Sequence, residues 1–429
     1  MWVYNLVIFL YGFVIKLASI KKTKAKQWVS GRRNWRRILS DKVSKLNNKP
    51  LLWIHCASYG EFEQGRPLIE AVKKKHPDYK ILVSFFSPSG YEAFKDWKGA
   101  DIICYLPLDT KRNARDFIDI VKPQTVIFIK YEFWLNFLFQ LKEKNIPTFL
   151  VSAVFKPHHP FFKWYGHIFR RSLKTFNELL LQDDNSGELL KSIGVTNYEV
   201  FGDTRYDRVL QIRQNFKPTP QIENFKGNNK LIIAGSTYTK DVDLILNAFN
   251  NSKFKVQNSK LIIVPHLVDD KSIAETTALL NEHKVSYSLY MQTINNNAQV
   301  LVVNTMGLLS KMYYYADCAY IGGSFDGGLH NTLEAAVYGI PVVFYGDDYQ
   351  NYNEAVDLLK LGTATTVANS DELANVFNTF LNFSPYPSPQ ERGVSPLLGD
   401  GREVLKEKLN LFFETHANAT SKVLEALKL

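Results

Sequence analysis

The stretch LLWIHCASYGEFEQGRPLIEAVKKK, residues 51–75, contains the pattern that decides the fold. Its apolar run LLWIHCA predicts a buried strand, and the amphipathic run that ends in three lysines predicts a helix. The turn between them contains Glu61 and Glu63, whereas turns are more often filled by Asn, Asp, Ser and Pro. Acidic residues favour the first turn of a helix, and a carboxylate placed there can also serve as a base. This turn is therefore both a helix start and a candidate catalytic position.

The same alternation of apolar strands and amphipathic helices continues along the chain. It predicts βαβ units and parallel sheets. The polar segment 211–229 contains two prolines and predicts a linker. The fold class is therefore α/β, with Rossmann-like doubly wound domains at 23–210 and 230–383. Strands are predicted at residues 51–57, 80–86, 101–108, 125–131, 148–155, 178–184 and 198–204, and at 230–236, 260–266, 300–305, 318–324 and 341–347.

Three other segments complete the predicted organisation. An aromatic helix is predicted near residues 161–176. The segment 384–401 is rich in Pro, Ser and Gly, which predicts an exposed loop, and an amphipathic helix is predicted at 402–429. Doubly wound sheets bind ligands beyond the carboxyl ends of their strands, so we expect the active site in a cleft that the two domains face.

The composition limits the classes of partner. The chain has 429 residues, and its 52 basic residues outnumber the 42 acidic ones, which gives a formal net charge of +10. Such a surplus favours nucleic acid, phosphorylated small molecules or a lipid surface. No helix-turn-helix or RNP-like motif occurs, so nucleic acid is not expected. Cys56, Cys104 and Cys318 are far apart, so neither a zinc site nor a disulfide framework is predicted.

The first 22 residues predict a membrane anchor. Residues 2–20 are almost wholly apolar, and a bilayer is spanned by about 20 such residues. No basic residue precedes Lys16, unlike in a signal peptide, and a run of Lys and Arg follows it as far as Arg37. The positive-inside rule then places the rest of the chain on the cytoplasmic side. A spanning anchor, a half-inserted anchor and a buried helix of the first domain are the alternatives.

A glycine-rich segment of the second domain, GGSFDGGLHNTLEAAVYGIPVVF at residues 322–344, predicts a phosphate site. Glycines let backbone N–H groups approach an anion, and a helix that begins after His330 would add partial positive charge. The segment matches neither the dinucleotide fingerprint nor the P-loop. Asn331 and Glu334 also have the spacing of a capping box, which would explain both residues without a ligand.

A series of features, taken in order along the chain, resembles the 3-deoxy-D-manno-octulosonic acid (Kdo) transferases of glycosyltransferase family 30. The resemblance covers nearly the whole chain. It implies a GT-B fold and a membrane-associated enzyme of the cell inner membrane that transfers Kdo from CMP-Kdo to a lipid A precursor in lipopolysaccharide biosynthesis. It implies no metal or cofactor in catalysis. The features are the N-terminal anchor, ASYGEF (57–62), GDTRYD (202–207), IIAGST (232–237), IIVPH (262–266), NTMGLL (304–309) and GGSFDGGLHNTLEAA (322–336).

The resemblance also implies roles for individual residues. Glu61 is the expected general base of an inverting displacement. Glu63 has no role in the resemblance, and the helix dipole predicts that it is a solvated acid at the helix start. The groups that bind CMP correspond to Pro265, His266, Met306, Gly307, Leu308, Asn331, Thr332, Leu333 and Glu334. Further contacts are expected from Ser58, Gly60, Arg205, Ser236, Thr237, Gly327, Gly328 and His330.

Four positions depart from the residues that are usual in the family. His266 stands where many relatives have Arg, and Leu308 stands where many have Glu. Leu329 stands where a second Gly is frequent, and Arg205 stands where Lys is common. Arg205 keeps the positive charge but presents a planar fork of donors. Two other functions stay open: a membrane-associated GT-B enzyme with a UDP-sugar donor, and a tethered nucleotide- or lipid-binding protein without activity. Turnover of CMP-Kdo distinguishes them.

Overall fold

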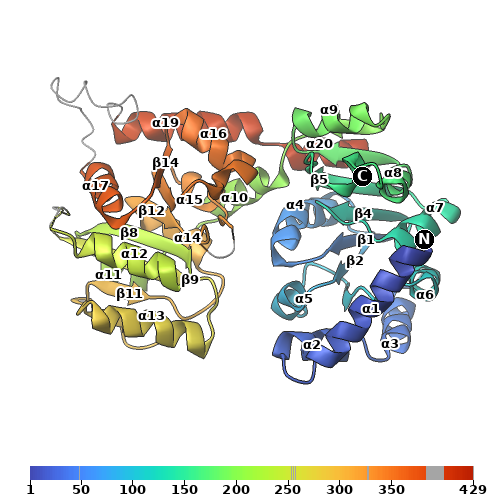
Figure 1. Cartoon of the computed structure of the whole chain (residues 1–429), viewed down its shortest axis with the longest axis horizontal. Helices are drawn as coiled ribbons and strands as arrows, with labels where there is room; N and C mark the ends of the chain where they lie inside the picture. Colours follow the sequence, from blue (N-terminus) through green and yellow to red (C-terminus); the bar gives the residue numbers. More distant parts are fainter. Residues whose placement is uncertain are drawn as a thin grey trace. The chain divides into compact units, whose positions relative to one another are not determined.

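The computed structural model describes residues 1–47, 49–252, 254, 256, 258–325, 328–382 and 401–428. The chain forms two compact units (Figure 1), which are Met1–Arg208 with His416–Leu429, and Val209–Thr415. The predicted loop at 384–401 lies outside the described residues except for Gly401.

The first unit contains a seven-stranded parallel sheet, as the sequence predicts. β1 lies between β2 and β4, so the chain order of the strands reverses at this point, where doubly wound sheets bind their ligands. All residues of β1 and β4 are buried, which is why both read as continuous apolar runs. In spatial order the strands are β3 (Ile102–Tyr105), β2 (Lys80–Phe85), β1 (Leu51–Cys56), β4 (Thr125–Ile129), β5 (Thr148–Ala153), β6 (Glu178–Leu181) and β7 (Tyr198–Val200).

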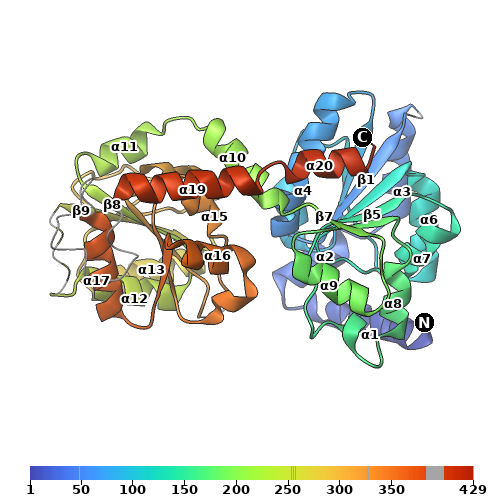
Figure 2. The ribbon, with the colours of Figure 1, turned by 90° about the horizontal axis from the view of Figure 1, so that it is seen from above.

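Helices cover both faces of this sheet. One apolar core joins the sheet to α3, α6, α7, α8 and α9, and a second joins it to α4 and α20. α20 lies beside α4 although the two are far apart in the chain (Figure 2). The helices of this unit are α1 (Trp2–Ala18), α2 (Thr23–Ser30), α3 (Trp35–Val43), α4 (Tyr59–Lys75), α5 (Pro88–Phe94), α6 (Lys111–Val121), α7 (Leu135–Glu143), α8 (His167–Leu173), α9 (Asp184–Ser192) and α20 (Ala419–Ala426), and α10 (Thr204–Gln214) continues into the second unit.

The second unit repeats the architecture with another seven-stranded parallel sheet. In spatial order its strands are β10 (Tyr287–Leu289), β11 (Val300–Val302), β9 (Ser259–Pro265), β8 (Lys230–Thr237), β12 (Cys318–Ile321), β13 (Val342–Tyr345) and β14 (Ala364–Val367). One of its cores packs α12, α13 and α17 on the sheet. Its helices are α11 (Pro220–Lys226), α12 (Thr239–Phe249), α13 (Asp270–Glu282), α14 (Leu309–Met312), α15 (Leu333–Ala336), α16 (Asn353–Leu361), α17 (Ser370–Leu381) and α19 (Arg402–His416).

The structure differs from the sequence predictions in four places. β10 and β14 were not predicted, because each is a short edge strand with little apolar signal. The predicted helix at 161–176 is a short 3-10 turn followed by α8, since Gly166 approaches the Pro160 carbonyl too closely for a side chain. The predicted helix at 402–429 is broken at Asn418, which is left-handed. The predicted linker at 211–229 includes the end of α10 and all of α11.

α1 packs on the first unit through one face only. Ile8 and Gly12 are buried, and the Tyr4 hydroxyl donates to Asp109 Oδ2 at 2.5 Å. The opposite face is exposed and apolar. No helix among the described residues is both long and apolar enough to cross a membrane. The exposed side chains are Trp2, Val3, Leu6, Val7, Phe9, Leu10, Tyr11, Phe13, Val14 and Leu17.

Candidate active site

A buried polar cluster lies at the carboxyl edge of the first sheet, where β2, β1 and β4 are neighbours. His55 is near the end of β1, Ser84 is near the end of β2, and Glu132 follows β4. His55 Nδ1 lies 2.8 Å from Ser84 Oγ and 3.1 Å from the Ser84 carbonyl oxygen. His55 Nε2 lies 3.2 Å from Glu132 Oε2, and the Trp134 indole N–H donates to the same carboxyl oxygen. Sequence reasoning missed these residues, because only the strand order brings them together.

Burial determines the charge of this cluster. It lowers the pKa of His55 to about 4 and raises the pKa of Glu132 to about 8. Near pH 7 both groups are therefore neutral. A neutral His55 that donates from Nδ1 to the Ser84 carbonyl leaves Nε2 as an acceptor for the Glu132 carboxyl group or the Trp134 N–H. The contact between His55 and Glu132 is thus a hydrogen bond between neutral groups.

Glu61 lies next to this cluster in the first turn of α4. The Ser58 backbone N–H and hydroxyl donate to Glu61 Oε2 at 2.8 and 3.2 Å, while Oε1 has no hydrogen-bond partner among the described residues. Burial raises the pKa of Glu61 to about 7, and the neighbouring Glu132 adds to this rise, while His55, the Ser58 N–H and Lys130 lower it. The side chain is half-buried, so water and substrates can reach it. Such a carboxylate can take up a proton near neutral pH.

Glu63, the other acid of the turn, is not a solvated charge. Arg208 Nε lies 2.6 Å from Glu63 Oε2, and Arg66 Nη1 lies 3.6 Å from Oε1. Arg66 also pairs with Glu70 at 2.8 Å. These ion pairs correct the expectation of a free acid at the helix start, because α10 brings Arg208 onto α4. Glu63 therefore has a structural role.

Arg205 and Gly60, two further predicted substrate contacts of the first unit, have different surroundings. Arg205 is paired with Asp203, with both Nε and Nη2 lying 2.7 Å from Oδ2. Its charge is therefore partly neutralised by its own loop. A Cβ added at Gly60 would meet no atom within 4 Å, so packing does not require a glycine beside Glu61.

The predicted groups of the second unit gather at the carboxyl edge of its sheet. Thr237 ends β8 and Pro265 ends β9, and the His266 N–H donates to the Thr237 carbonyl oxygen at 2.9 Å. Gly323 follows β12 with a φ of +109°, a conformation that needs glycine, and its N–H donates to Asp241 Oδ2. Ser236 is also left-handed, with a φ of +55°. The ends of β8, β9 and β12 thus form one edge.

Unpaired polar atoms concentrate at this edge. Eight buried side-chain N or O atoms lack a hydrogen-bond partner in the described part of the chain, and four of them belong to Thr237, Ser324, His330 and Thr332. An unpaired buried polar group costs free energy that a polar ligand would recover. The four atoms therefore indicate a ligand site. Thr237, His330 and Thr332 are contacts that the resemblance implies, whereas Ser324 was not predicted.

Three aromatic rings stack beside these atoms. The imidazoles of His266 and His330 have centroids 4.4 Å apart at an interplanar angle of 20°, and Tyr238 lies against both rings. Burial, and then the neighbouring His266, lower the pKa of His330 to about 4, so His330 is neutral near pH 7. Nowhere in the described ranges do three His, Cys, Asp or Glu side chains gather as metal ligands.

The two polar residues after His330 bond to each other, but not as the capping box that their spacing suggests, because Thr332 is the N-terminal cap residue of α15 and makes no side-chain cap hydrogen bond. Asn331 Oδ1 accepts from the Leu333 N–H at 3.1 Å, and its amide donates to Glu334 Oε1 at 3.3 Å. The helix α15 has only four residues. It therefore aligns too few peptide dipoles for the strong positive end that the sequence predicts.

The remaining predicted groups lie in loops at the same edge. Met306 and Gly307 lie between β11 and α14, and Leu308 is the N-terminal cap residue of α14. Met306 is 62% exposed, so its side chain is accessible to a ligand. Gly328 has a φ of +84°. Gly327 lies outside the described residues.

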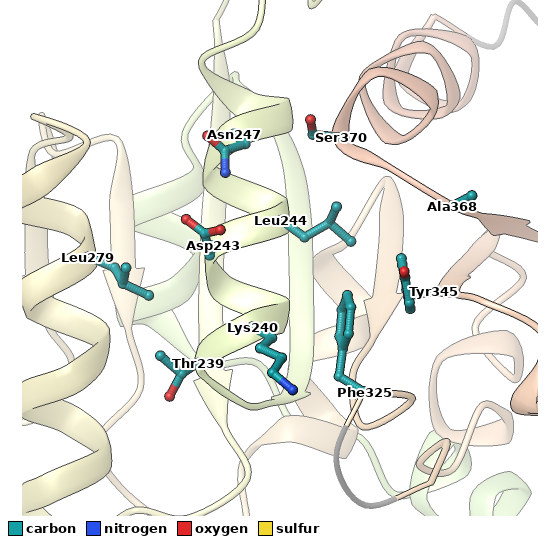
Figure 3. A pocket seen from close by; sticks show the side chains of 10 residues that line it. All are labelled: Thr239, Lys240, Asp243, Leu244, Asn247, Leu279, Phe325, Tyr345, Ala368 and Ser370. Carbon is teal, nitrogen blue, oxygen red and sulfur yellow. The ribbon is translucent and has the colours of Figure 1, made fainter.

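A pocket of about 450 Å³ lies elsewhere in the second unit, outside α12 (Figure 3). The rings of Phe325 and Tyr345 stack along one side of it, and Lys240 and Asp243 extend from α12. None of the predicted site residues lines this pocket. The candidate functional groups lie instead at the carboxyl edge of each sheet, with Glu61 in the first unit and the unpaired polar atoms in the second.

Two parallel-sheet units of this kind define a GT-B-like fold. The chain resembles solved structures of that architecture, such as the UDP-GlcNAc 2-epimerase of Neisseria meningitidis bound to UDP-GlcNAc, with a TM-score of 0.60 and 14% identity over 88% of this chain and 99% of that one. At this identity the likeness concerns the fold alone.

The sequence comparisons identify the family. Residues 32–208 match the family model described as 3-deoxy-D-manno-octulosonic-acid transferase (kdotransferase). The 3-deoxy-D-manno-octulosonic acid transferase of Aquifex aeolicus is 30% identical over 80% of this chain and 89% of its own length. That of Haemophilus influenzae is 27% identical over 77% of this chain and 79% of its own. The chain belongs to the Kdo transferase family and is a glycosyltransferase.

Replacing Glu132 by Gln should change the pH dependence of stability. The folded-state pKa of Glu132, about 8, lies above its ordinary value of 4.5, so the stability contributed by the protonated form is lost as the pH rises from about 4.5 to about 8. In urea unfolding, the Glu132→Gln variant should therefore be more stable than the parent by up to about 5 kcal/mol at pH 9, and the two should differ little near pH 4.5. Glu188→Gln, an exposed substitution in the same unit, is the control. A difference that is the same at both pH values would contradict the prediction.

Proposed function

We propose that this chain transfers Kdo from CMP-Kdo to a lipid A precursor in lipopolysaccharide biosynthesis, with Glu61 as the general base. One observation carries the proposal. Glu61 has one carboxylate oxygen held by Ser58 and one without a partner among the described residues, and its pKa is about 7. A base must be deprotonated at the working pH and still basic enough to accept a proton from a sugar hydroxyl, and this pKa meets both needs.

The reaction that we propose is a direct, inverting displacement. The acceptor hydroxyl attacks the anomeric carbon of Kdo and passes its proton to Glu61 Oε1. The bond between that carbon and the phosphate oxygen breaks, and CMP leaves with the bonding electrons. The neutral His55 and Glu132 side chains support this role, because they leave Glu61 as the group that ionises near pH 7.

The second unit supports the donor part of the proposal. Phosphate and ribose oxygens are acceptors and donors that would pair with the unpaired Thr237, Ser324 and Thr332 hydroxyls. The stacked His266 and His330 rings would offer a flat face for a base or sugar. The exposed Met306 would add an apolar contact.

Incubation with CMP-Kdo and a lipid A precursor, read out by product mass, should show Kdo added to the lipid. Glu61→Gln should lower kcat by about 10²–10⁴-fold with little change in the donor KM, because the base acts only in the transition state. In the parent, kcat/KM should fall as the pH decreases through about 7, since protonated Glu61 cannot accept the proton.

Glu63→Gln is the matched control, two residues away on the same helix, and should keep activity within a few-fold if the protein folds. Full activity of Glu61→Gln would refute the base. Turnover of a UDP-sugar without turnover of CMP-Kdo would show that the donor is a UDP-sugar. An inactive parent would favour the alternative of a binding protein without activity.

Thr332→Val should weaken donor binding without weakening the fold. The Thr332 hydroxyl is buried and unpaired, so its loss costs the free protein nothing, whereas a ligand oxygen would lose a partner. We expect the CMP-Kdo KM to rise about tenfold and the Tm to stay or rise. In the control Thr363→Val, the lost hydroxyl donates to the Leu358 carbonyl oxygen. In this control the Tm should fall, and the KM of CMP-Kdo should stay unchanged. If Thr332→Val has the same KM of CMP-Kdo as the parent, Thr332 does not contact the donor.

We also propose that α1 attaches the chain to the cytoplasmic face of the cell inner membrane. The outward face of α1 is apolar along its length, and the segment after it is rich in Lys and Arg. An amphipathic helix of this kind partitions into a membrane interface, and the cations attract anionic headgroups. The lipid acceptor would be reached from the same surface.

The double substitution of Phe9 and Phe13 by Ser should reduce binding to vesicles of anionic phospholipid by about tenfold, because two exposed aromatic rings are lost. Co-sedimentation measures the bound fraction. Leu411→Ser removes an equally exposed apolar side chain from the second unit and should not change binding. Equal binding of the double variant and the parent would exclude this face of α1 as the attachment surface.

A further inference from the structure

Lys130 has a backbone conformation that its position does not explain. It follows β4 with a φ of +70°, in the left-handed region, where a side chain with a Cβ is strained. Lys122 and Lys284 are also left-handed, but they lie at or just after the ends of helices α6 and α13, where this conformation is ordinary. Lys130 directly follows a buried strand instead. Strain of this kind persists where the surrounding structure holds it, and it marks functional positions.

The side chain of Lys130 has no structural partner among the described residues. It is exposed, and its ammonium group makes neither a hydrogen bond nor an ion pair with them. Only its backbone N–H is engaged, with the Val151 carbonyl oxygen at 2.8 Å. The ammonium therefore contributes little to the fold.

The position of Lys130 places this free cation at the candidate site. β4 is the strand next to β1 at the point where the chain order reverses, and Glu132 of the buried cluster lies two residues further along. The ammonium is close enough to Glu61 for its charge to lower the pKa of that carboxyl group. A strained residue thus holds an unpaired cation at the strand edge near which the proposed base lies.

We propose that Lys130 binds an anionic oxygen group, a phosphate or a carboxylate, of a sugar substrate whose reacting atoms lie next to Glu61. This inference rests on the proposed function. An ammonium has three donors and no acceptor, and its hydrogen bonds are strongest to the anionic oxygens of a phosphate or a carboxylate. The anion belongs either to a phosphate of the lipid acceptor or to the carboxylate of Kdo in the donor, and the experiment distinguishes these sources.

The experiment compares Lys130→Met with Lys122→Met. Both variants lose one exposed, left-handed lysine from the first unit, so they change net charge and backbone strain alike. Binding of the acceptor, with and without its phosphate groups, is measured by calorimetry in the absence of donor, and the KM of CMP-Kdo is measured separately. The parent and Lys122→Met should bind the phosphorylated acceptor about tenfold or more tightly than the dephosphorylated one.

In Lys130→Met this preference should be lost if the anion is the acceptor phosphate. If the preference is kept and the CMP-Kdo KM rises about tenfold, the anion is the donor carboxylate. If neither quantity differs from that of Lys122→Met, the proposal is overturned. The binding measurement needs no turnover, so an inactive parent refutes the proposed function without deciding the role of Lys130.

Two additional variants separate charge from backbone. Lys130→Gly relieves the left-handed strain and removes the ammonium, so its Tm should not fall while its effect on binding should equal that of Lys130→Met. Lys130→Arg should restore the preference. The pH profile of kcat/KM gives a further readout. The groups that act on the Glu61 pKa are Glu132, which raises it, and His55, the Ser58 N–H and Lys130, which lower it. Loss of the Lys130 ammonium alone should therefore raise the pKa of Glu61 and move the acid limb of the profile to higher pH.

Discussion

Burial of the central strands on both faces is the constraint on which both units depend. Every residue of β1 and β4 is buried, so polar side chains along these strands must find partners inside the protein or lie at the strand ends. His55 is the strongly polar residue of β1, and its ring nitrogens are hydrogen-bonded to Ser84 and Glu132. The parallel arrangement then places all strand ends that bear polar groups at one edge of the sheet.

The same burial determines the charges at that edge. Desolvation disfavours ionised groups, so it keeps His55 and Glu132 neutral and moves the pKa of Glu61 to about 7. Glu61 is less buried than its neighbours and keeps one oxygen free of partners in the described structure. A carboxylate that would be an ordinary helix-start acid in water thereby acquires the properties of a base at neutral pH.

The two units satisfy their polar groups differently. In the first unit the polar side chains around Glu61 bond to each other, which holds them in one arrangement. In the second unit, hydroxyls such as those of Thr237 and Thr332 are buried without partners among the described residues. Mutual hydrogen bonds position a reactive group, whereas unpaired groups favour the binding of a ligand that completes them. The roles that we propose, catalysis in the first unit and donor binding in the second, rest on this difference.

The sequence by itself determined the α/β class, the positions of nearly all strands along the chain and the segments that hold Glu61, His266 and Asn331. It did so because the spacing of apolar residues and the turn residues are local signals. It also predicted the family. It did not identify His55 or Glu132, since these residues are 77 positions apart and meet only because β1 and β4 are neighbours. It could not separate Glu63 from Glu61 by charge, as only α10 brings Arg208 to Glu63. Which carboxylate is paired, and which is desolvated and left with a free oxygen, was decided by the tertiary structure, because burial and charge contacts depend on residues distant in the chain.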